Sequence, residues 1–73
     1  MTTLEDYRVR CRWSKAEMAR QARIDASTLN RAMRGIPVSL DTAKKLASAI
    51  SECLGISVHY QDIEDLNIIQ QSL

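Results

Sequence analysis

Apolar residues recur every three or four positions along most of the chain, which is the period of an α-helix with one buried face. The stripe that predicts a first helix consists of Leu4, Tyr7 and Cys11. This helix should begin near Thr2 or Thr3, in a capping box where a threonine hydroxyl accepts from a backbone amide and an acid three residues later reaches back. Thr2 with Glu5 is the expected pair, and Thr3 with Asp6 is the weaker alternative.

Ser14 marks the start of a second helix, because its hydroxyl can accept from the amide of Glu17 while the Glu17 carboxylate reaches back to the Ser14 amide. Trp13 and Met18 fit the apolar pair that often brackets such a cap. The inner stripe of this helix consists of Met18, Ala19 and Ala22. The small side chain of Ala19 should let the next helix cross closely.

A third helix is predicted after a tight turn, with Asp25 as the expected N-cap and Ser27 as the alternative. Its core-facing residues are Leu29 with Ala32 or Met33. Gly35 should end the helix in the left-handed conformation, and Pro37 enforces the stop two residues later. Residues 14–35 are therefore expected to form two short helices joined by a tight turn, the arrangement that places a helix in the major groove of DNA.

Ser39 should cap a fourth and longest helix that ends at Gly55. Its buried stripe consists of Leu40, Ala43, Leu46, Ala47, Ile50 and Leu54. Beyond Gly55 two patterns overlap. A strand-like alternation is formed by Ile56, Val58 and Tyr60. A helical period is formed by Tyr60, Ile63, Leu66 and Ile69. We expect an extended stretch to about residue 60 and then a short helix.

These elements predict an all-α fold of four to five helices, with a possible short extended segment near the C-terminus. A length of 73 residues fits one domain. Residues 1–55 are expected to hold the helix pair and its core, and residues 56–73 form a C-terminal tail of the same domain.

Charge is distributed unevenly along the chain. The net charge is +1, but residues 1–35 carry +4 and residues 36–73 carry −3. A basic half that contains the helix pair and an acidic tail that faces away from phosphate suit a nucleic-acid-binding protein.

Other function classes find little support in the sequence. No apolar run approaches the length of a membrane span and no signal peptide is evident, so a cytoplasmic protein without membrane contact is expected. Cys11 and Cys53 fall on helical apolar positions and are expected to be buried thiols in a reducing compartment. With His59 they lack the spacing of a zinc site, so we expect no metal and no cofactor. A single histidine, no nucleophile–base pair and no phosphate-binding loop argue against an enzyme.

The chain resembles the Cro and lambda-repressor-like helix-turn-helix family of the XRE type over roughly residues 4–54. The first-helix residues that carry the resemblance are Leu4, Tyr7, Arg8 and Trp13 before Ser14. The motif residues are Ala19, Ile24 and Leu29, followed by Gly35, Ser39–Leu40 and the stretch Ala47–Ile50. Three positions depart from the family pattern. Arg23 replaces the turn glycine at a cost on the order of 1 kcal/mol, Lys15 replaces a glutamine, and Met33 replaces the acid that commonly pairs with Arg8.

The resemblance implies a sequence-specific regulator of transcription that binds double-stranded DNA. Such a protein would work in a bacterial or phage-infected cell, associated with the nucleoid, and would most often repress. The residues expected to meet bases in the major groove are Ala26, Ser27, Thr28, Asn30 and Arg31. Arg31 is the candidate for guanine, and Asn30 could pair with adenine or reach phosphate. The residues expected to meet phosphate are Lys15, Arg23 and Arg34.

The tail holds more apolar residues than a small core needs, so we expect a homodimer on a palindromic operator. The expected dimerisation residues are Ile56, Val58, Tyr60, Ile63, Leu66 and Ile69. Glutamates at Ile63 and Leu66 should then leave a folded monomer. The chain has no room for a separate effector domain, and no small-molecule effector is expected.

The alternative function is a protein-interaction module, resembling an antirepressor or an antitoxin-like partner, that keeps the helix-turn-helix shape. The acidic tail and the missing turn glycine favour it.

Overall fold

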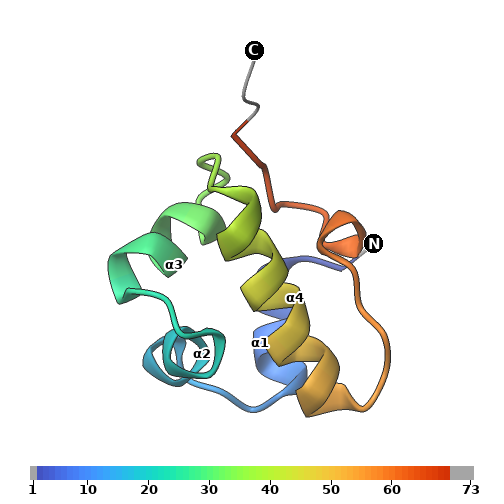
Figure 1. Cartoon of the computed structure of the whole chain (residues 1–73). Coiled ribbons are helices and arrows are strands. Elements are labelled where there is room, and N and C mark those ends of the chain that lie inside the picture. Colours follow the sequence, from blue (N-terminus) through green and yellow to red (C-terminus); the bar gives the residue numbers. More distant parts are fainter. Residues whose placement is uncertain (1, 70–73) are drawn as a thin grey trace.

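Four α-helices surround an aliphatic core in the computed structural model, which describes residues 2–69 (Figure 1). The helices are α1 (Leu4–Arg10), α2 (Lys15–Ala22), α3 (Ala26–Met33) and α4 (Leu40–Leu54), followed by a single 3-10 turn, η1 (Tyr60–Asp62). Pairing of extended backbone within the described residues is confined to two isolated parallel bridges, Thr2 with Ile63 and Val38 with Ile68. The all-α prediction is confirmed. Within residues 2–69 no helix combines the length and the apolar character needed to cross a bilayer.

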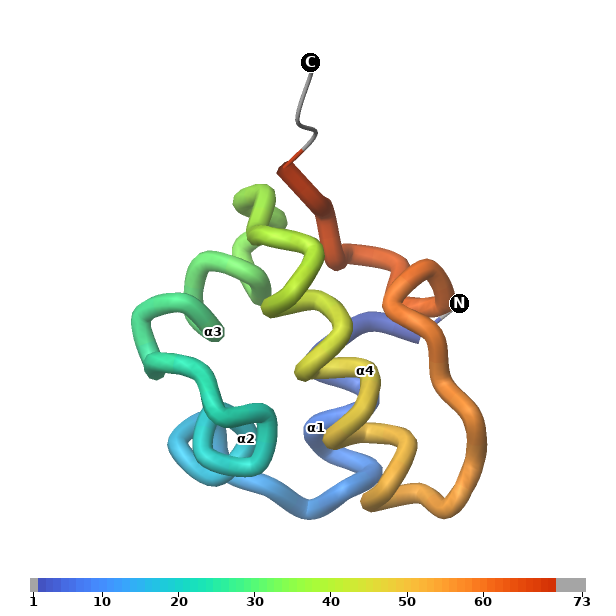
Figure 2. The backbone as a smooth tube through the Cα atoms, in the orientation of Figure 1, coloured from blue at the N-terminus to red at the C-terminus, as the bar shows by residue number. Residues whose placement is uncertain are grey.

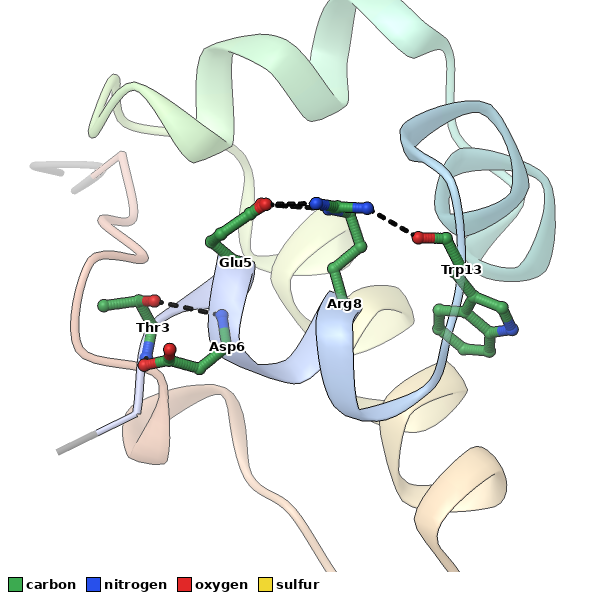
Figure 3. A network of polar contacts seen from close by, with 5 residues as sticks. All are labelled: Thr3, Glu5, Asp6, Arg8 and Trp13. Atoms are coloured by element: carbon green, nitrogen blue, oxygen red, sulfur yellow. Dashed lines mark hydrogen bonds and ion pairs between the residues drawn. The ribbon is translucent and has the colours of Figure 1, made fainter.

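The cap of α1 corrects one expectation. Thr3, not Thr2, is the N-cap: its hydroxyl accepts from the Asp6 amide at 3.2 Å, and its own amide donates to Asp6 Oδ2 at 3.1 Å (Figure 3). The Thr2–Glu5 box fails for a tertiary reason. The Thr2 carbonyl accepts from the amide of Glu64 at 2.9 Å, and the Glu5 carboxylate is bound by an arginine of its own helix.

The caps of the other helices follow the sequence closely. Ser14 accepts from the Glu17 amide at 3.0 Å, but the Glu17 carboxylate binds Arg20 and Gln21 and leaves the box half-formed. Asp25 is the N-cap of α3 without a side-chain hydrogen bond, so the Ser27 alternative is wrong. Gly35 is left-handed as expected, with φ +81°, and Gly55, where α4 ends as expected, has φ +68°.

α4 lies at the centre of the packing and contacts α1, α2 and η1 (Figure 1). The largest fully buried side chains are Leu4, Met18, Leu29, Leu46 and Ile50. Ala19, 4% exposed, lies on the face of α2 that packs on its neighbours, as expected of a small residue at a helix crossing. Leu40 departs from the predicted stripe, because at the first position of α4 its side chain is 41% exposed.

The tail is part of the core, and this corrects the role assigned to it. Val58, Ile63 and Leu66 are 8%, 2% and 9% exposed within the single chain, and Tyr60 packs against the same cluster. The helix expected after residue 60 is only one 3-10 turn. Since the four helices are short and rich in alanine, they need the tail to complete the core. The reason for assigning these side chains to a dimer interface is therefore removed.

Hydrogen bonds from backbone and side chains hold the tail along two regions distant in sequence. Near the N-terminus, Leu4 donates its amide to Asp65 Oδ1 at 2.9 Å. At the α3–α4 connection, Asn67 Nδ2 donates to the Gly35 carbonyl at 2.8 Å, and the Ile69 amide donates to the Val38 carbonyl at 2.8 Å. The tail thus ties the start of α1 to the end of α3, two points that local sequence does not connect.

Arg23 adopts the left-handed conformation at the end of α2, with φ 58° and ψ 45°. A side chain in this region costs on the order of 1 kcal/mol, whereas glycine adopts it without steric penalty. We therefore expect Arg23→Gly to raise the free energy of unfolding by about 0.5–1 kcal/mol, measured by urea denaturation. The matched control is Arg34→Gly, because Arg34 also follows a helix but has φ −90°. That variant should lose stability, and equal effects of both changes would contradict this account.

Candidate nucleic-acid interface

The helix pair predicted from residues 14–35 forms α2 and α3, which pack against each other on the side of the domain away from residues 56–62 (Figure 2). On α3, Leu29 and Ala32 are buried and Met33 is half-buried. The remaining face is open to solvent. It carries the residues expected to meet DNA, of which Thr28 alone is half-buried: Ala26, Ser27, Thr28, Asn30, Arg31 and Arg34.

The exposed face of α3 changes in chemistry along its length. Its first turn presents the short side chains of Ala26 and Ser27, and its last turn presents Arg31. Within residues 2–69 no carboxylate forms an ion pair with Arg31 or Arg34. Small side chains permit close approach to a groove floor, and guanidinium groups without internal partners retain their donors for an external acceptor.

Lys15 is exposed at the first position of α2, the end of the helix pair opposite to Arg31 and Arg34. The Ser14 hydroxyl is occupied by the Glu17 amide. The ammonium of Lys15 stands beside the positive end of the α2 dipole, so both favour an anion there.

Arg23 is placed apart from Lys15, although both were expected to meet phosphate. It lies at the other end of α2, about 12 Å away along the helix, and lines a shallow groove between α2 and α4 with Arg20, Lys45 and Glu52. The structure thus brings Lys15 and Arg23 to two different edges of the domain.

A polar network centred on Arg8 holds the entry to α2 (Figure 3). Arg8 Nη1 donates to the carbonyl of Trp13 at 2.7 Å, and Arg8 Nε donates to Glu5 Oε2 at 2.9 Å. Arg8 Nη2 also forms an ion pair with Glu5 Oε1. Glu5 therefore supplies the carboxylate that Met33 cannot. Only the i, i+3 spacing of Glu5 and Arg8 could have indicated this pairing from the sequence.

The network also has an electrostatic consequence. The hydrogen bond from Arg8 holds the pKa of Glu5 below its ordinary value of 4.5, and the charge of Lys15 adds a smaller lowering. A lowered pKa means that folding favours the ionised Glu5, so this contribution is present above pH 4.5 and is lost as the pH falls through the folded-state value.

Arg8→Met should lower the thermal midpoint by several degrees at neutral pH, because it removes the guanidinium but keeps the apolar stem. The midpoint of the wild-type protein should also fall more steeply between about pH 6 and about pH 3 than that of Arg8→Met. Calorimetry at both pH values measures both effects. A variant with the full acid sensitivity of the wild type would show that Glu5 is not stabilised by Arg8. Hydrogen bonds to Thr3 also lower the pKa of Asp6, and this adds the same acid sensitivity to the wild type and to the variant.

Comparison with known proteins gives one match. A family model described as Helix-turn-helix matches residues 4–60, from the first residue of α1 to the first residue of η1. No curated protein and no solved structure matches the chain.

Proposed function

The chain belongs to the XRE-type helix-turn-helix family of DNA-binding transcription regulators, and from this premise we propose that it represses transcription by binding a palindromic operator as a homodimer. The observation that carries the proposal is the exposed face of α3, where short side chains precede an amide and two guanidinium groups without internal ion-pair partners.

In this proposal the N-terminal part of α3 enters the major groove. Ala26, Ser27 and Thr28 come nearest to the base edges, where the hydroxyls donate or accept and a methyl group meets a thymine methyl. Arg31 binds the O6 and N7 acceptors of a guanine, and Asn30 pairs with adenine or reaches a phosphate.

Phosphate contacts fix the orientation of α3. Lys15 and the first amides of α2 bind one backbone segment. Arg34, the C-cap of α3, binds another. Arg23 would reach phosphate only where the DNA passes the groove between α2 and α4.

A second copy of the chain is proposed to bind beside the α3–α4 connection. Of the expected dimerisation residues, Ile56 and Ile69 are exposed, each at 54%. Ile69 lines a groove together with Leu40, whose side chain is 41% exposed. Gly35 lines the same groove, and the next residue, Ile36, is also exposed. Ile56 lies beyond the other end of α4, about 22 Å along the helix. The dimer contact is therefore assigned to Ile36, Leu40 and Ile69, which leaves the two α3 helices near the centre of the assembly.

Selection of bound sequences from a pool of random DNA duplexes tests the proposal. Enrichment of two inverted half-sites about 10 base pairs apart is the expected result. Enrichment of a single unrepeated site would retain DNA binding and reject the dimer. The alternative of a protein-interaction module would be favoured if no sequence were enriched and if the affinity of the protein for unselected DNA did not fall with rising salt. A reporter gene with the enriched site across its promoter then distinguishes repression from activation.

A further inference from the structure

The two cysteines of the chain lie at neighbouring helix ends, although 42 positions separate them in sequence. Cys11 is the C-cap of α1 and continues the stripe of Leu4 and Tyr7 that faces the core. Cys53 lies in the last turn of α4, three residues after the buried Ile50. α1 packs against α4, and Figure 2 shows their C-terminal ends at the same end of the domain.

The two thiols are neighbours at these helix ends. Partial burial, and to a lesser extent the nearby Cys53 side chain, raise the pKa of the Cys11 thiol to about 12. Cys11 is half-buried, whereas Cys53 is exposed, which corrects the expectation that both thiols are buried. The pair thus consists of one sulfur open to solvent and one partly covered sulfur that retains its proton.

We propose that Cys11 and Cys53 form an intramolecular disulfide when the protein meets hydrogen peroxide. The inference stands on the packing of α1 against α4, which brings the C-cap of α1 and the last turn of α4 to the same end of the domain. It is independent of the DNA-binding role.

The chemistry needs only the two thiols and the peroxide. The exposed Cys53 sulfur, as thiolate, attacks one peroxide oxygen, and the O–O bond breaks to give a Cys53 sulfenic acid and hydroxide. The Cys11 sulfur then attacks the Cys53 sulfur, the S–O bond breaks, and the proton of Cys11 leaves with the departing hydroxide as water. Two thiols are oxidised by two electrons, and one peroxide is reduced to two molecules of water.

The disulfide would enclose the helix-turn-helix in a covalent ring. Residues 11–53 contain α2, α3 and nearly all of α4. A cross-link across so long a segment restricts the unfolded chain much more than the folded one. The oxidised protein should therefore melt about 10 °C or more above the reduced protein. Neither cysteine lies on α3, so oxidation should leave the exposed face of that helix unchanged.

Stepwise treatment of the full chain with hydrogen peroxide, followed by intact mass, thiol titration and thermal denaturation, tests the proposal. The expected product is a monomer that has lost two hydrogen atoms and both titratable thiols, with a raised thermal midpoint that dithiothreitol restores. Reversal by dithiothreitol distinguishes the disulfide from methionine oxidation, which it does not reverse. Cys53→Ser and Cys11→Ser should each lack the raised midpoint.

Three outcomes of the peroxide treatment would overturn the proposal. Both thiols could remain open to alkylation, the products could carry only added oxygen, or disulfides could form only between chains. Because Cys53 is exposed, Cys53→Ser should fold as the wild type does, so its loss of the oxidative shift is attributable to chemistry.

Discussion

Ile63→Asp is expected to abolish the cooperative fold, whereas Ile69→Asp in the same tail should leave it intact. The Ile63 side chain is 2% exposed, inside the cluster formed with the helices, and its backbone bridges Thr2. A carboxylate at that position would lose its hydration without gaining a partner, at a cost of several kcal/mol. A domain of this size has roughly 5 kcal/mol to lose. Ile69 is 54% exposed, so the same change there leaves the carboxylate in water.

Circular dichroism with thermal denaturation measures the difference. Ile63→Asp should show no cooperative transition above ambient temperature, and Ile69→Asp should melt within a few degrees of the wild type. A well-folded Ile63→Asp would show that the tail does not belong to the core. The same reasoning reverses the expectation that glutamates at Ile63 and Leu66 leave a folded monomer. Sedimentation of folded Ile69→Asp then tests the proposed dimer contact without the complication of unfolding.

Arg31→Ala is expected to weaken binding to the selected DNA by about tenfold to a hundredfold and to relax preference at one base pair of each half-site. The physical reason is the loss of the bidentate donor pair that is assigned to guanine, whereas Arg34 is assigned to phosphate. Lys15→Ala should instead weaken binding to all sequences alike and reduce the dependence of affinity on salt.

Fluorescence anisotropy with the selected duplex and with single-base variants separates the two effects. Arg10→Ala is the matched control, because it removes the same charge from an exposed position of α1 to which no DNA contact is assigned. If Arg31→Ala retained full sequence preference, the assignment of base recognition to the last turn of α3 would be wrong. If Arg10→Ala weakened binding as much as Lys15→Ala, general charge would account for the phosphate contacts.

The elements that the sequence predicts well are those whose causes lie within one turn of helix. Ser14 and Ser39 start helices because a hydroxyl accepts from an amide three residues later. Gly35 ends one because it adopts positive φ. The stripe of Met18, Ala19 and Ala22 is buried as its period indicates. The exposed face of α3 follows from the same periodicity, so the candidate interface could be drawn from sequence alone.

The features that the sequence could not settle are contacts between residues distant along the chain. Thr3 rather than Thr2 caps α1, and Thr2 instead pairs with the tail through a bridge to Ile63 and a hydrogen bond from Glu64. Arg23 stands apart from Lys15 because α2 separates them, with Arg23 beside α4.

The tail shows the limit most clearly. Its apolar residues fit both a strand-like alternation and a helical period. Neither pattern indicates whether a side chain is buried in the core of its own chain or in an interface with a second chain. The sequence by itself determined the four helices, the caps of α2, α3 and α4, and the chemistry displayed on α3, because short-range hydrogen bonds and helical period decide these. Only the tertiary structure decided that Ile63 and Leu66 are buried in their own chain and that Cys11 meets Cys53, because both depend on how α1 and the tail pack against α4.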